Sequence, residues 1–262
     1  MESQPILHQL REGVAEVTLN RPEVLNSFNK PMARQLQSLL AEAADDPRVR
    51  CVLLAGAGRA FCAGQDLAEA VPSQGPPADV EEIVRHSYNP LIRTLRVMEK
   101  PVVAAVQGTA AGAGANIALA CDFVIAASDA SFLQAFCKIG LIPDSGGTYF
   151  LPRLAGFARA SAMAMLGEKL PAEEALRAGL VYKVVPPSDL AEEARQLAVR
   201  LARMPTRALG LTKIALNRSL ENDLERQLEI EAELQGVASR TRDYREGVAA
   251  FLEKRKPKFT GG

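Results

Sequence analysis

The chain has 262 residues, enough for one large domain or two ordinary ones with a substantial core. Lys plus Arg and Asp plus Glu each total 31, so there is no excess positive charge for binding a nucleic-acid backbone. A hydrophobic fraction of 48% excludes a disordered chain, and the two histidines, His8 and His86, have no neighbouring ligand partners for a zinc site.

The cysteines and the N-terminus bear on the cellular setting. Cys51, Cys62, Cys121 and Cys137 show no Cys-x-x-Cys spacing, and no basic segment followed by an apolar run begins the chain. Both observations predict free thiols in a reduced, cytoplasmic setting. Residues 101–121 carry no charge over a membrane-spanning length, but they are rich in Ala and Gly rather than Leu, Ile and Phe. We therefore predict a buried strand, turn and helix there, and no membrane association.

The first half of the chain alternates between strand-like and helix-like segments. Helical spacing of apolar residues predicts helices at 31–44 and 80–97. Strand followed by helix, recurring about every 50 residues, predicts an α/β fold with repeated ββα turns. The strand-like segments are 14–19, 51–55, 102–106 and 123–127.

After Pro152 the pattern changes to helices almost alone. Ser188 or Asp189 is expected to cap the helix that starts at Leu190. The change predicts a core of residues 1–190 and a C-terminal helical region of residues 191–262 that packs on the core or on another subunit. The predicted helices are 158–166, 171–178, 190–204, 206–219, 223–236 and 243–254.

Three segments rich in small residues, 59–67, 107–116 and 140–148, each follow a strand or start a helix. Backbone N–H groups at such places lack intrahelical partners, and two that converge on one oxygen form an oxyanion hole. Glycine and alanine let a ligand carbonyl approach the backbone closely. Taken singly, each segment is also explained as a tight turn with close packing.

Together with residues 19–27 and 179–185, these three segments resemble the crotonase, or enoyl-CoA hydratase/isomerase, family over essentially the whole chain. The resemblance implies a spiral of ββα repeats and a C-terminal helical region that forms a homotrimer or a dimer of trimers. It also implies an acyl-CoA thioester as substrate, with no separate cofactor and no metal.

The resemblance assigns site residues by position. The backbone N–H groups of Ala63 and Ala113 are implied as donors to the thioester oxygen. Tyr88 and Phe136 are expected in the wall of the acyl pocket. The basic ending at 254–258 is either a solvated tail or a contact for CoA phosphates, in the same subunit or in a neighbouring one. The residues implied to contact CoA are Val24, Ala63, Asp66, Leu67 and Lys258.

Two departures from the family pattern predict the reaction type. Hydratases of the family carry a glutamate at each of the positions held here by Asn116 and Phe136, and neither residue can exchange a proton as water addition requires. Asp144 is the remaining candidate for an acid or base. Asp122 precedes a strand and Asp129 lies in a polar turn, so both have a structural explanation. One carboxylate beside an oxyanion hole suits an isomerase.

We expect apolar neighbours of Asp144, namely Phe136, Ile142 and Pro143, to raise its pKa through burial. The alternative interpretation is that Asp144 caps the helical turn at residues 146–150. In this alternative the carboxylate has a structural role and takes no part in catalysis.

Within the family, segments such as 61–67, 88–91 and 243–248 are similar to isomerases of aerobic phenylacetate catabolism. These convert 2-(1,2-epoxy-1,2-dihydrophenyl)acetyl-CoA to 2-oxepin-2(3H)-ylideneacetyl-CoA. A Δ3,Δ2-enoyl-CoA isomerase of β-oxidation is the nearest alternative. A non-catalytic acyl-CoA-binding subunit is the alternative of another class, and Asp144 argues against it.

Overall fold

The computed structural model describes residues 4–70 and 78–262. Its main sheet has six strands in the order β1-β2-β3-β4-β6-β9. The pair β1 and β2 is antiparallel, and every other neighbouring pair in this sheet is parallel. The strands are β1 (Ile6–Arg11), β2 (Val14–Leu19), β3 (Cys51–Gly56), β4 (Val102–Val106), β6 (Phe123–Ala127) and β9 (Lys183–Val185).

A second sheet and a set of helices complete the described part of the chain. The second sheet has the order β5-β7-β8, with β5 (Thr109–Ala111), β7 (Ser131–Leu133) and β8 (Lys169–Pro171). The first helices are η1 (Pro22–Val24), α1 (Lys30–Asp45), α2 (Leu67–Ala70), α3 (Val80–Ile83), η2 (Val84–Tyr88), α4 (Asn89–Val97) and α5 (Ala113–Leu119). The others are η3 (Ala135–Ile139), α6 (Gly147–Ala155), α7 (Phe157–Leu166), α8 (Ala172–Arg177), α9 (Leu190–Ala202), α10 (Thr206–Ser219), α11 (Leu224–Ala238) and α12 (Arg242–Leu252).

The four predicted strands are confirmed as β2, β3, β4 and β6. The edge strand β1 gave no strand signal because only Ile6 of its six residues is buried. The three-residue strands are too short for their composition to stand out. The predicted helix at 80–97 is helical throughout, but its middle is the π-helix η2.

The sheet brings the glycine- and alanine-rich segments together in the core. Every residue of α5 is buried, and so is every residue of β4. A Cβ atom built on Gly114 would lie 2.5 Å from the carbonyl oxygen of Cys62. The small residues therefore let α5 pack directly on the segment that follows β3.

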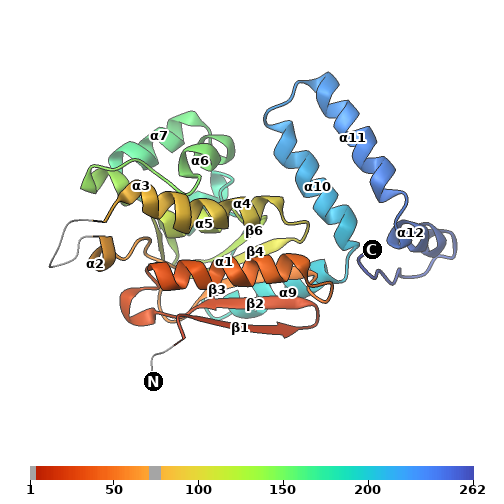
Figure 1. Cartoon of the computed structure of the whole chain (residues 1–262), viewed down its shortest axis with the longest axis horizontal. Helices are drawn as coiled ribbons and strands as arrows, with labels where there is room; N and C mark the ends of the chain where they lie inside the picture. The colour runs from red at the N-terminus through yellow and green to blue at the C-terminus, as the bar shows by residue number, and fades with distance from the viewer. Residues whose placement is uncertain (1–3, 71–77) are drawn as a thin grey trace.

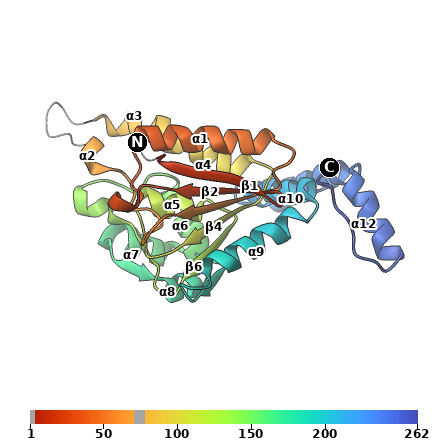
Figure 2. The ribbon, with the colours of Figure 1, turned by 90° about the horizontal axis from the view of Figure 1, so that it is seen from below.

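The predicted boundary at residues 190 and 191 falls just before α9. This helix contacts β3, β4 and β6, on the opposite side of the sheet from α1 (Figure 2). It therefore belongs with the core rather than with the helices after it. Asp189 holds the N-cap position, but its side chain makes no capping bond, so the expected cap is wrong. Its Oδ1 atom accepts the Ser188 hydroxyl.

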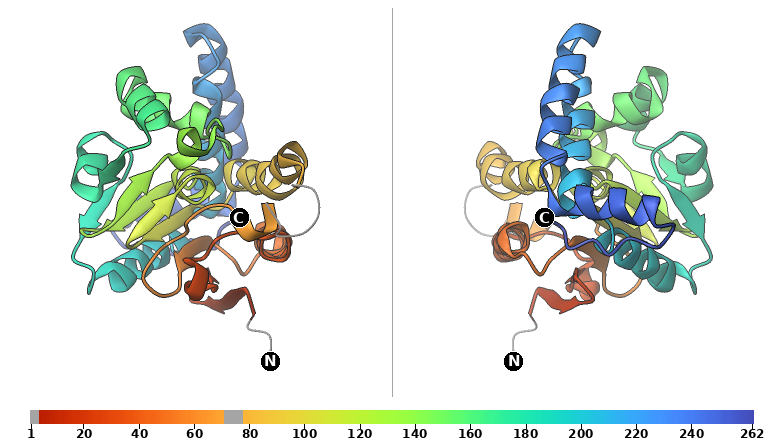
Figure 3. Two further views of the ribbon diagram at one scale, coloured as in Figure 1. Left: turned by 90° about the vertical axis from the view of Figure 1, so that its left-hand side faces the viewer. Right: turned by 90° about the vertical axis from the view of Figure 1, so that its right-hand side faces the viewer.

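The last three helices extend from the core. α10 contacts α4 and pairs with α11, and this hairpin rises beside the sheet (Figures 1 and 3). α12 and the C-terminus lie at the end of the molecule far from α2 and α3 (Figure 1). Buried Asp243 of α12 holds the final residues, because its carboxylate accepts the N–H groups of Thr260 and Gly261.

None of the helices in residues 4–70 and 78–262 has both the length and the apolar composition to cross a membrane. Within the same ranges, no three His, Cys, Asp or Glu side chains are grouped so that they could hold a metal ion.

Candidate active site

In the segment after β3, one backbone N–H group, that of Gln65, is left without a hydrogen-bond acceptor among the residues that the structure describes. Phe28 N–H donates to the Gly64 carbonyl at 2.7 Å, and Asp66 N–H donates to the Phe28 carbonyl at 2.8 Å. In this parallel pairing Gln65 lies between the two bonded positions, so its own N–H and C=O point away from Phe28. The Gln65 N–H donates to no acceptor in the described part of the chain.

The prediction that Ala63 supplies a donor is wrong. Its N–H donates to the Leu25 carbonyl at 2.9 Å and is not free for a ligand. Gly64 has a φ of +94°, which only glycine adopts easily, and this turn points the N–H of Gln65 in a direction different from that of Ala63. Sequence reasoning missed Gln65 because every residue except proline has a backbone N–H, so the residue type does not show which N–H is free.

Ala113 is the first residue of α5, where N–H groups have no intrahelical acceptor. Its N–H has no partner among the described residues, and the helix dipole adds partial positive charge there. A Cβ atom built on Gly64 would lie 3.5 Å from the Ala113 nitrogen and 2.9 Å from the Ala111 oxygen. The two segments therefore run side by side.

Gln65 and Ala113 both line one pocket of about 220 Å³ with mostly apolar walls. Asp144 lines the same pocket, and so do Tyr88 and Phe136. Two free N–H groups and one carboxylate thus meet in one apolar space, although they come from three distant segments.

A tight turn presents Asp144 to this pocket. The next two residues, Ser145 and Gly146, have φ values of +50° and +78°, and α6 follows. The Asp144 carbonyl accepts the Gly147 N–H and the Asn116 side-chain amide, each at 2.8 Å. The backbone of Asp144 is therefore fixed from two sides.

The carboxylate of Asp144 is half-buried and accepts one hydrogen bond, from Ser145 Oγ to Oδ1 at 2.8 Å. Gly146 holds the N-cap position of α6, so the capping interpretation of Asp144 is wrong. Burial raises the pKa of Asp144, and the Ser145 bond opposes that rise. Ile142 is 78% exposed, so the expectation that it shields this carboxylate is also wrong.

Asn116 is fully buried and forms part of the support of the site. Its amide exchanges hydrogen bonds with the amide of Gln134, at 2.8 and 3.3 Å. Asn116 does not line the pocket. Neither Asn116 nor the Phe136 ring can supply a second acid or base, so Asp144 is the carboxylate of this pocket.

Of Val24, Asp66 and Leu67, which were expected to contact CoA, only Leu67 lines the pocket. Leu67 lines the pocket and is exposed, whereas Val24 is exposed in η1 outside it. Asp66 forms an ion pair with Arg21 at 2.8 Å and accepts the Ala68 N–H.

Lys258 lies apart from this pocket. It follows α12, and its N–H donates to Glu246. This end of the molecule is far from α2 and α3 in two perpendicular views (Figures 1 and 2). Lys258 therefore does not reach the pocket of its own chain, and of the two expected arrangements only a contact with the CoA of a neighbouring subunit is left.

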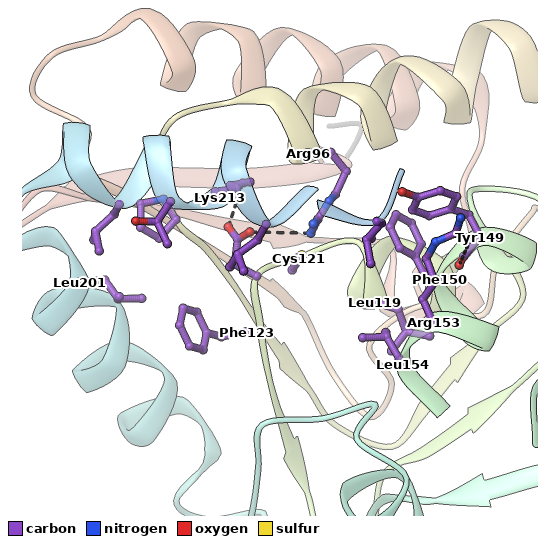
Figure 4. A pocket seen from close by; sticks show the side chains of 16 residues that line it. Arg96, Leu119, Cys121, Phe123, Tyr149, Phe150, Arg153, Leu154, Leu201 and Lys213 are labelled. Carbon is purple, nitrogen blue, oxygen red and sulfur yellow. Dashed lines mark hydrogen bonds and ion pairs between the residues drawn. The ribbon is translucent and has the colours of Figure 1, made fainter. Parts of the chain in front are cut away.

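A second pocket lies between α6, α9 and α10, with a volume of about 320 Å³ (Figure 4). Its charged groups are paired: Lys213 Nζ donates to Asp122 Oδ2 at 2.8 Å, and Asp122 also accepts the Val102 N–H. The Arg153 guanidinium lies 3.7 Å from the centre of the Tyr149 ring. This pocket offers no free carboxylate beside unpaired N–H groups.

Comparison with known proteins supplies the family. The profile described as enoyl-CoA hydratase/isomerase matches residues 9–262. The chain is 52% identical over 257 residues to the 1,2-epoxyphenylacetyl-CoA isomerase of Escherichia coli K12, with 98% of both chains covered. The chain belongs to the enoyl-CoA hydratase/isomerase family.

Other similar proteins are named as hydratases rather than isomerases. A Rhodobacter capsulatus protein named "Probable enoyl-CoA hydratase" is 48% identical over 261 residues, with 100% of both chains covered. An enoyl-CoA hydratase/isomerase structure from Mycobacterium abscessus matches with a TM-score of 0.94 and 40% identity, covering 98% of this chain and 100% of that one. This match confirms the expected crotonase-like fold. Because the relatives include both reaction types, the choice between them rests on the site residues.

Proposed function

We propose that this family member is a CoA-thioester isomerase that acts on a ring epoxide, converting 1,2-epoxyphenylacetyl-CoA to oxepin-CoA. The observation that carries the proposal is the single carboxylate, Asp144, in a pocket with two free backbone N–H groups. Hydration needs a second positioned acid or base, and Asn116 and Phe136 supply none. The 52% identity to the Escherichia coli isomerase supports the choice of substrate.

The proposed reaction moves one proton and keeps all other atoms. The epoxide is in exchange with its seven-membered oxepin form, in which the carbon–carbon bond shared by the two rings is open. The Asp144 carboxylate takes a proton from the carbon next to the thioester, and the electron pair shifts onto the thioester oxygen. The protonated Asp144 then gives the proton to the ring carbon next to the substituted one. The double bond moves out of the ring to the side chain, which yields the ylidene product.

Negative charge develops on the thioester oxygen during this step. The N–H groups of Gln65 and Ala113 would donate to that oxygen, and the N-terminus of α5 favours the same charge. A substrate that fills this mostly apolar pocket would displace water from it, which would strengthen both hydrogen bonds. The same residues would shift a double bond from Δ3 to Δ2 in a linear enoyl-CoA. That reaction also moves a proton from the carbon next to the thioester to a carbon two positions away. It stands as the second candidate.

Product identification with the purified protein tests this proposal. We expect chromatographic separation and ultraviolet absorption to show oxepin-CoA formed from 1,2-epoxyphenylacetyl-CoA, with faster turnover than for 3-hexenoyl-CoA at equal concentration. Crotonyl-CoA is the control for hydration and should gain water slowly or not at all. Preference for 3-hexenoyl-CoA would favour the second candidate. Rapid hydration of crotonyl-CoA would refute the isomerase assignment.

The pH dependence of the reaction follows from the state of Asp144. Only the carboxylate can accept a proton, and burial raises the pKa of Asp144, so kcat/KM should fall on acidification at a higher pH than an ordinary aspartate would give. Ser145→Ala removes the donor that stabilises the carboxylate and should move this acid limb to a still higher pH. A pH profile of kcat/KM in both proteins checks the direction, and a downward shift would contradict it.

We also propose that α10 to α12 mediate a homotrimer or a dimer of trimers in the cytoplasm. Exposed apolar side chains on this region support association: Leu224 is 70%, Phe251 84% and Leu252 74% exposed. In such an assembly Lys258 would meet CoA only at a neighbouring subunit.

A further inference from the structure

The π-helix η2 brings a buried tyrosine to the wall of the pocket. η2 joins α3 to α4, and its carbonyls at His86 and Ser87 accept hydrogen bonds from the Gln37 side chain of α1, at 2.7 and 3.0 Å. Single π-turns of this kind are frequent at functional sites. Held in this way, η2 places Tyr88, which is 1% exposed, against the segment after β3.

Tyr88 contacts both groups that determine how Gln65 is held. Its hydroxyl donates to Gln65 Oε1 at 2.6 Å. Its ring packs edge-on against Phe28 at a centroid distance of 6.0 Å, and Phe28 forms the backbone bonds on either side of Gln65. The other bonds of the Gln65 amide are longer, at 3.3 Å to the Asp66 carbonyl and 3.4 Å to Glu69.

We propose that Tyr88 is a positioning residue, whose hydroxyl holds the Gln65 side chain and thereby fixes the direction of the Gln65 backbone N–H toward the thioester oxygen. This inference rests on the proposed function. Tyr88 does not exchange a proton with substrate in this role. Burial raises the pKa of its hydroxyl, which keeps the proton available for donation.

The hydroxyl adds nothing that the packing of the core requires. A phenylalanine at this position would keep the contact of the ring with Phe28 and fill the same space. Within the described residues, the Tyr88 hydroxyl bonds only to Gln65. That partner is half-buried, lines the pocket and carries the unpaired N–H.

The test uses Tyr88→Phe, Gln65→Met and the double variant, with Tyr182→Phe as the control because Tyr182 is 57% exposed and packs on Phe123. A misdirected oxyanion donor should lower kcat about 10-fold, less than the loss of a donor outright, with KM within about threefold. The two single variants should lose similar activity, and the double variant little more, because both break one hydrogen bond.

A spectroscopic readout separates positioning from packing. Bound 4-dimethylaminocinnamoyl-CoA absorbs at longer wavelength when its thioester carbonyl is polarised by hydrogen bonds. We expect this shift in the wild type and in Tyr182→Phe, and a smaller one in Tyr88→Phe and Gln65→Met. An unchanged shift in Tyr88→Phe, even with reduced stability or kcat, would overturn the positioning role. No shift in the wild type would instead refute the oxyanion pocket on which the proposed function depends.

Discussion

Asp144→Asn is expected to lower kcat about a thousandfold, since a positioned general base contributes about 10²- to 10⁴-fold. The asparagine can still accept the Ser145 hydroxyl and keep the turn before α6. The affinity for a non-reactive acyl-CoA should therefore stay within about threefold, because binding relies on the pocket walls and the N–H groups. Steady-state kinetics and calorimetric titration check the two quantities.

Asp129→Asn is the matched control, because Asp129 is an exposed aspartate in the turn after β6. Its kcat should equal that of the wild type. Burial raises the pKa of Asp144 above the value of an unfolded chain, so the charged carboxylate destabilises the fold at neutral pH. The melting temperature of Asp144→Asn should accordingly not fall. A folded Asp144→Asn protein with substantial turnover would eliminate Asp144 as the base.

Ala113→Pro is expected to lower kcat/KM by about 10²- to 10³-fold, the loss found when one oxyanion donor is removed. Proline lacks the N–H, yet the first position of a helix tolerates it well. Ala113 is the first residue of α5 and follows a glycine of positive φ, Gly112. The substitution therefore removes the donor while the helix is kept.

Phe157→Pro provides the comparison for this variant. Phe157 is the first residue of α7, also follows a glycine of positive φ, Gly156, and lies outside the pocket. Its kcat/KM should stay within about twofold of the wild type, as is usual for an exposed change away from the site. If both proline variants lose the same activity, the loss reports damage to helices. If Ala113→Pro retains full activity, Ala113 is not a donor.

The two substitutions separate the two parts of the proposed reaction. Asp144 moves the proton, and the N–H groups of Gln65 and Ala113 stabilise the charge that this movement creates. Neither part depends on a histidine or a metal in this scheme. The scarcity of histidine that is visible in the sequence is consistent with such chemistry.

Sequence reasoning was most successful where local pattern reports burial. β4 and α5 are buried along their whole length, and their uncharged, small-residue sequence predicted a strand, a turn and a helix between residues 101 and 121. The edge strand β1 and the π-turn η2 were missed. β1 exposes most of its side chains, and η2 lies inside residues 80–97, whose apolar pattern predicts one continuous helix.

The sequence alone predicted Asp144 as the carboxylate of the site, because a carboxylate is a side-chain choice and Asn116 and Phe136 stand where hydratases of the family carry glutamates. The structure places Asp144 in the pocket. The sequence also predicted a turn and a helix within residues 101–121, and the structure starts that helix, α5, at Ala113. Only the tertiary structure showed that the N–H of Ala63 is paired with Leu25 and that the N–H of Gln65 is free in the part of the chain that the structure describes. It also showed that Lys258 is bonded to Glu246 of α12, at the end of the molecule far from α2 and α3. The physical reason is that a side chain is written in the sequence, whereas the availability of a backbone N–H depends on which distant carbonyl the fold places opposite it.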